Sequence, residues 1–133
     1  MATTRNAAAN TWLDKAMSDI KAARVLFGAD MLMHTGFMCH QAIEKSLKAC
    51  YISLHDTRQP QTHNLEKLVD ECGLAEKIDD SKAAILQKLM PLYTATRYED
   101  EGNTIANLLI KPYCKTLLRE TGVLMNWIMQ YMN

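Results

Sequence analysis

Apolar side chains recur every three or four positions along most of the 133-residue chain, the period of an amphipathic helix. The pattern is clearest in residues 11–27, 31–54 and 112–132, with shorter helical stretches at 64–71 and from residue 79 onward. No segment alternates strictly between apolar and polar residues, so a sheet is not expected. The sequence therefore predicts an all-α fold, an up-and-down antiparallel bundle of about five helices.

Residues that favour helix ends support these boundaries. Thr11 and Asp30 are predicted N-caps of the first and second long helices, because their side chains can accept hydrogen bonds from free backbone N–H groups. Gly28 and Gly73 are predicted to follow or end helices, since glycine tolerates the conformations found there. Pro91 cannot continue a helix undisturbed, so a break is expected at that position.

The expected organisation is one helical domain, residues 11–133, preceded by a flexible segment at residues 1–10. Residues 99–103 are predicted to form an acidic loop before the last helix. The 15 Lys and Arg residues balance the 15 Asp and Glu residues. This balance disfavours a protein that binds nucleic acid with its whole surface, although a local basic patch remains open.

The cysteine pattern and the start of the chain favour a cytoplasmic protein. The cysteines do not form a C-x-x-C pair, which favours reduced core thiols over disulfides or a zinc site. The chain shows neither a secretory signal nor an apolar run long enough to span a membrane. Phosphate-binding glycine loops and metal-hydrolase motifs are missing, so no cofactor or metal is predicted. The cysteines are Cys39, Cys50, Cys72 and Cys114.

Three polar residues lie four positions apart on the second long helix: His40, Glu44 and Lys48. This spacing places them on one helix face. Spacing alone favours a solvent-exposed stripe in which Glu44 and Lys48 form a pair worth a few tenths of a kcal/mol. The alternative is a polar face that lines a cleft or a dimer seam.

Two further positions are candidates for chemistry. His63 follows Pro60 where a loop leads into a helix, and it either braces that turn or acts as a catalytic base. Arg97 and Tyr98 follow the interrupted helix, and a guanidinium beside a phenol can bind phosphate and stack on a base. The alternative is that Arg97 pairs with a carboxylate, such as that of Glu44, while Tyr98 is half-buried.

Four segments taken in order resemble a known family. Residues 40–49 (HQAIEKSLKA) look like the long-helix signature of the HEPN family, and residues 62–65 (THNL) resemble its entry to the next helix. Residues 91–98 (PLYTATRY) are similar to its P-x-Y-x-x-x-R-Y segment, and residues 12–27 resemble its opening helix. The resemblance covers about residues 11–132, and the ordered set is more specific than any one motif.

The resemblance implies a prokaryotic helical bundle that dimerises and is often encoded beside a minimal nucleotidyltransferase, in a toxin–antitoxin pair. It also implies that many relatives are metal-independent ribonucleases with an R-x(4–6)-H motif. This chain departs from that motif, because no histidine follows Arg97 and Asn103 stands where one is expected. Asparagine does not exchange a proton near neutral pH as imidazole does, so ribonuclease activity is an open question.

We therefore expect a nucleotide- or RNA-binding module that homodimerises and partners a minimal nucleotidyltransferase. One alternative is a ribonuclease toxin in which Arg97 holds the phosphate and His63 or His40 supplies the base. The other alternative is a purely structural dimerisation module. The predicted ligand-binding residues are His40, Glu44, Lys48, His63, Arg97 and Tyr98.

Overall fold

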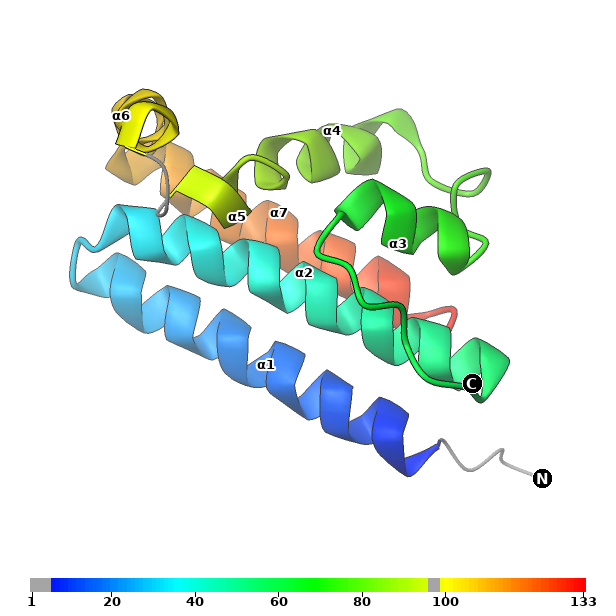
Figure 1. The fold of residues 1–133 in the computed structure, drawn as a ribbon. Helices are drawn as coiled ribbons and strands as arrows, with labels where there is room; N and C mark the ends of the chain where they lie inside the picture. Colours follow the sequence, from blue (N-terminus) through cyan, green and yellow to red (C-terminus); the bar gives the residue numbers. More distant parts are fainter. Residues whose placement is uncertain (1–5, 96–98) are drawn as a thin grey trace.

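A computed structural model describes residues 6–95 and 99–133, with the backbone alone for residues 99–103. Every regular element in the described part of the chain is a helix (Figure 1), which confirms the all-α prediction. The helices are α1 (Ala7–Gly28), α2 (Leu32–His55), α3 (Leu65–Glu71), α4 (Asp80–Leu89), α5 (Leu92–Ala95), α6 (Glu99–Leu108) and α7 (Lys111–Met129).

Helix α2 is the central element of the bundle. It runs antiparallel to α1, and α7 packs along it while α3, α4, α5 and α6 cover the remaining side (Figure 1). Each of the other helices contacts α2, and 14 of its 24 residues are buried. A helix surrounded in this way has little surface left for water, so polar residues on α2 must find partners within the protein.

The turn between α1 and α2 differs from the sequence prediction at both N-caps. Asn6 caps α1 by accepting a hydrogen bond from the N–H of Ala8, so Thr11 lies inside the helix and is not its cap. The predicted Asp30 cap is also wrong. Asp30 adopts a φ of 60° in the tight reversal after α1, and its carboxylate accepts a hydrogen bond from Lys111 of α7.

The segment from α3 to α5 follows the predicted start and stop signals. Asn64 caps α3, and Asp79 caps α4 by accepting a hydrogen bond from the N–H of Lys82. Gly73 follows α3 with a φ of 73°, a left-handed conformation that suits glycine. Pro91 separates α4 from the short helix α5, so the predicted break is confirmed.

The predicted acidic loop at residues 99–103 is wrong, because these residues begin helix α6. An acidic first turn suits the positive end of the helix dipole, and this local preference outweighs the loop tendency of Gly102. Residues 96–98, and with them Arg97 and Tyr98, lie outside the described residues. The proline of α7 occupies its first turn as predicted.

The core is one continuous apolar cluster to which helices on all sides of α2 contribute. The four cysteines are buried, which confirms the prediction that they are core residues. Burial raises the pKa of the Cys39 thiol to about 12. In the described part of the chain, no helix is both long enough and apolar enough to cross a membrane.

Candidate functional site

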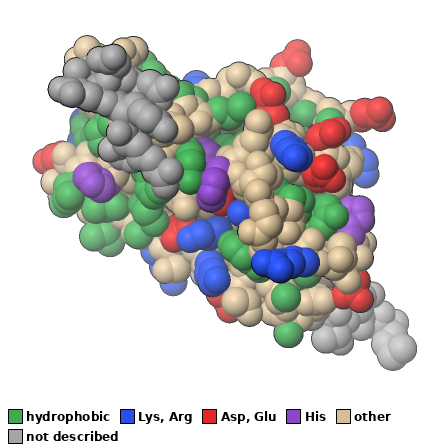
Figure 2. Space-filling view, in the orientation of Figure 1, with side chains coloured by type: hydrophobic (Ala, Val, Ile, Leu, Met, Phe, Trp, Pro, Cys, Tyr) green, Lys and Arg blue, Asp and Glu red, His purple; other side chains and the backbone are tan. Residues whose placement is uncertain are grey.

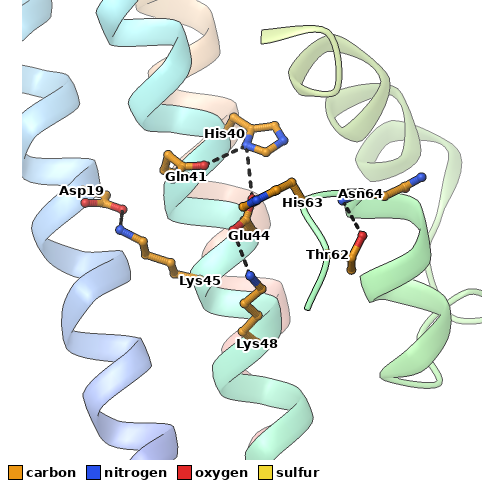
Figure 3. Close-up of polar contacts among 9 residues, drawn as sticks. All are labelled: Asp19, His40, Gln41, Glu44, Lys45, Lys48, Thr62, His63 and Asn64. Atoms are coloured by element: carbon orange, nitrogen blue, oxygen red, sulfur yellow. Dashed lines mark hydrogen bonds and ion pairs between the residues drawn. The ribbon is translucent and has the colours of Figure 1, made fainter. Parts of the chain in front are cut away.

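The polar stripe of α2 is buried. His40, Glu44 and Lys48 are 1%, 3% and 6% exposed, so the solvent-exposed arrangement favoured by spacing is wrong. Spacing places the three residues on one face of α2 but does not determine whether another part of the protein covers that face. Here the face is covered by the loop between α2 and α3, by α5 and by α1. Glu44 Oε2 lies 3.0 Å from Lys48 Nζ and accepts its hydrogen bond (Figure 3).

The loop before α3 delivers His63 to this stripe. His63 Nδ1 lies 3.0 Å from Glu44 Oε1, and half of the imidazole side chain remains exposed (52%). The local sequence explains this position. Thr62 Oγ1 accepts a hydrogen bond from the N–H of Asn64, and the Asn64 side chain caps α3, so both neighbours of His63 are fixed (Figure 3).

Tyr93 of α5 forms an aromatic wall next to His63. The two rings are stacked at 4.3 Å between centroids and 18° between planes. The Tyr93 ring also packs near the rings of His40 and Phe37, with 5.3 Å and 6.1 Å between the ring centroids. Next to these rings lies a pocket of about 240 Å³, lined by His63, Asn64, Leu65, Met90, Tyr93 and Thr94.

The Glu44 carboxylate determines the hydrogen-bonding state of His63. An ionised carboxylate only accepts hydrogen bonds, so Nδ1 of His63 is the donor and Nε2 of the neutral ring is the acceptor. The half-exposed ring therefore has an oriented nitrogen that can accept a ligand hydrogen bond or, when protonated, contact a phosphate.

His40 behaves differently from His63, because it is enclosed. Burial lowers the pKa of His40 below 6.5, and the nearby Glu44 carboxylate opposes this effect only in part. Its Nδ1 lies 3.3 Å from Gln41 Oε1 and 3.9 Å from Glu44 Oε1. His40 is therefore neutral near pH 7 and supports the Tyr93 ring, without providing a charge for a ligand.

The structure brings four of the six predicted residues into one cluster: His40, Glu44, Lys48 and His63. Sequence reasoning did not select Tyr93, Asn64 or the other pocket residues as site residues. The available signal was the P-x-Y segment, because its tyrosine is the residue that stacks on His63.

The comparisons with known proteins agree with this architecture. The family model described as "HEPN domain" matches residues 9–131, nearly the whole chain, and the protein belongs to this family. The fold resembles a solved crystal structure of the protein TT1696 from Thermus thermophilus. The TM-score is 0.78 at 18% identity, with 93% of this chain and 98% of that one covered. No curated protein matches the sequence.

Proposed function

We propose that the protein is a nucleotide- or RNA-binding module whose ligand occupies the pocket beside His63 and Tyr93. The observation that carries this proposal is the half-exposed His63 ring, which is stacked on Tyr93 and oriented by the buried Glu44 carboxylate. Proteins hold bases by stacking on aromatic rings and hold phosphates with oriented N–H donors. The pocket offers the Tyr93 ring for stacking and the Asn64 amide as a donor. The outer nitrogen of His63 becomes a further N–H donor to a phosphate when the ring is protonated.

Arg97 and Tyr98 are included in this proposal on sequence grounds. In the chain, Arg97 is the second residue after α5, the helix that carries Tyr93, and Tyr98 is the third. Arg97 supplies the permanent positive charge that a phosphate prefers. The test is binding of a fluorescent adenosine nucleotide and of a labelled oligoribonucleotide, measured by anisotropy. His63→Ala and Arg97→Ala are expected to weaken binding about tenfold or more, and His34→Ala is the exposed histidine control. Unchanged affinity in both site variants would refute the assigned site.

We also propose that the protein homodimerises and partners a minimal nucleotidyltransferase in a toxin–antitoxin-type pair. Membership of the family supports this proposal, as does a groove between α1 and α7 that includes Met17, Gly122 and Met129. Met17 is 41% exposed, and Val123, the residue after Gly122 on α7, is 50% exposed. Exposed apolar surface of this kind is typical of protein–protein interfaces. Co-expression with the product of the neighbouring reading frame, followed by light scattering, gives the stoichiometry. Monomeric protein that does not retain the neighbour would refute this part.

A ribonuclease is the second candidate, and the Glu44–His63 hydrogen bond is the observation that favours it. A histidine whose Nδ1 donates to a carboxylate has Nε2 available as a general base for a 2′-hydroxyl. Cleavage of structured and unstructured RNA by the wild type, but not by His63→Ala or Arg97→Ala, would support it. Equal cleavage by all three proteins would exclude these residues as its catalytic groups.

A structural role is the third possibility, and it is distinguished by stability. The buried Glu44–Lys48 pair would then serve the fold alone. In that case the His63 and Arg97 variants would change the midpoint of unfolding without changing the binding of any nucleotide, RNA or protein partner.

A further inference from the structure

We infer that the ligand is a single-stranded oligonucleotide rather than a mononucleotide, because Trp12 on α1 forms a second stacking site beside the first. This inference rests on the proposed function and specifies the class of ligand. Trp12 is half-buried, and two ammonium groups lie over its ring. Lys15 Nζ is 4.6 Å and Lys48 Nζ is 5.4 Å from the ring centroid.

The two lysines over Trp12 have different roles. Lys48 is buried and held by Glu44, so it is a fixed part of the protein. Lys15 is exposed at the surface of α1, and its long side chain can move from the ring to a phosphate. An aromatic ring beside a mobile cation suits a nucleotide unit, because the base stacks while the cation neutralises the backbone.

The Glu44–Lys48 pair joins the Trp12 site to the His63 site. One oxygen of Glu44 binds His63 and the other binds Lys48, which in turn lies over Trp12. The two aromatic sites are therefore separated by a single buried ion pair. The steps of this path measure 5.4 Å from the Trp12 ring centroid to Lys48 Nζ and 3.0 Å on each side of the Glu44 carboxylate, so a strand of a few nucleotides would reach both sites.

The same path continues toward the beginning of α1. Ala8 lies one turn before Trp12, on the same side of the helix, and it lines a second pocket of about 300 Å³ that includes Arg58. Arg58 belongs to the loop that also carries His63, so both ends of this loop border a pocket. Figure 2 shows several Lys and Arg side chains close together on this face of the molecule. Lys48 and Lys45 are paired with Glu44 and Asp19, so Lys15 and Arg58 are the cations on this path proposed to meet the phosphates.

The two tryptophans of the chain make the test direct. Trp127→Phe leaves Trp12 as the only tryptophan, so its fluorescence reports on this site alone. Adenosine monophosphate and oligoadenylates of two, four and eight nucleotides are titrated into this variant. We expect Trp12 emission to change with the oligonucleotides and not with the mononucleotide, and affinity to rise about tenfold from one nucleotide to four.

Two further variants isolate the second site. In the Trp12→Phe variant, measured by anisotropy with labelled oligoadenylate, most of the increase in affinity with oligonucleotide length is expected to be lost. Its affinity for the mononucleotide is expected to stay at the wild-type value. Lys15→Met should weaken tetranucleotide binding several-fold and reduce its salt dependence, whereas Lys21→Met, an exposed lysine on the same helix, serves as the charge-matched control.

The outcomes separate this inference from the proposed function. If mononucleotide and oligonucleotides bind equally and Trp12 emission does not respond, the second site is wrong and the binding module stands. If only the mononucleotide binds, the inference is equally overturned. If no nucleotide of any length binds, the proposed function itself is refuted.

Discussion

Glu44 Oε1 accepts a hydrogen bond of 3.0 Å from Nδ1 of His63, a residue 19 positions later in the chain. The same carboxylate holds Lys48 through its other oxygen, so one buried acid connects the loop before α3 to the centre of α2. Because the Glu44 carboxylate pairs with Lys48 of the core and with His63 of the candidate site, a change at Glu44 affects both the stability of the fold and the position of the His63 ring.

Replacement of Glu44 should therefore be strongly destabilising. Glu44→Leu leaves the Lys48 ammonium buried without its carboxylate, and breaking a buried pair in this way costs about 3–5 kcal/mol. The double variant Glu44→Leu/Lys48→Leu should recover most of this loss, since two apolar side chains tolerate burial. Urea unfolding at pH 7 measures both values. As a control, Glu120→Ala removes the more exposed pair with Lys88 and should cost about 0–1 kcal/mol. Equal losses at Glu44 and Glu120 would contradict the burial argument.

The N-cap of α3 should contribute to stability and to the position of His63. Asn64→Ala removes the hydrogen bond from the N–H of Lys67 to the Asn64 side chain, which is expected to cost about 1 kcal/mol. Asn64→Asp keeps an acceptor at the cap and should remain close to wild type. Chemical denaturation gives the energies, and the NMR signals of the His63 ring report whether the ring has moved. If Asn64→Ala left the free energy of unfolding unchanged, contacts other than the Asn64 cap would have to hold the turn before α3.

His40 should make the protein less stable in acid. Its pKa is lowered by burial, so between pH 6.5 and the lower native value the unfolded chain binds more protons than the folded one. Stability is therefore unaffected by this group above about pH 7 and falls as the pH drops below 6.5. Unfolding midpoints measured from pH 7.5 to 5 test this sign. His40→Gln should flatten the dependence, whereas His34→Gln, at an exposed position of the same helix, should leave it unchanged.

Two helical glycines should respond differently to alanine. Gly122 of α7 has open space around its missing Cβ, so Gly122→Ala should stabilise the protein by about 0.5–1 kcal/mol through helix propensity. At Gly36 of α2 a new Cβ would lie 3.1 Å from Leu109 and 3.2 Å from Leu92, both buried. Gly36→Ala should therefore gain less or be destabilising, because crowding offsets the propensity. Thermal unfolding of the two variants side by side tests this difference, and equal stabilisation would contradict the close contact of α2 with Leu92 and Leu109.

The sequence by itself determined most of the helices of this protein, because helix formation depends on local spacing and on residues at the helix ends; the start of α6, predicted as a loop, is the exception. The period of the apolar residues located α1, α2 and α7. Gly73 marked the end of α3, Asp79 the start of α4, and Pro91 the break between α4 and α5. The ordered motifs also identified the HEPN family, which the family model confirms. Local rules were wrong where a tertiary contact or a neighbouring residue took over the cap, as at Thr11 and Asp30.

Only the tertiary structure decided what the polar stripe of α2 does. Periodicity placed His40, Glu44 and Lys48 on one face, but an exposed face and a covered one have the same spacing. The face is covered because α2 contacts every other described helix and because the loop before α3 brings His63 across it. The stacking of His63 on Tyr93 joins residues 30 positions apart, and such contacts arise from packing, which no local pattern encodes.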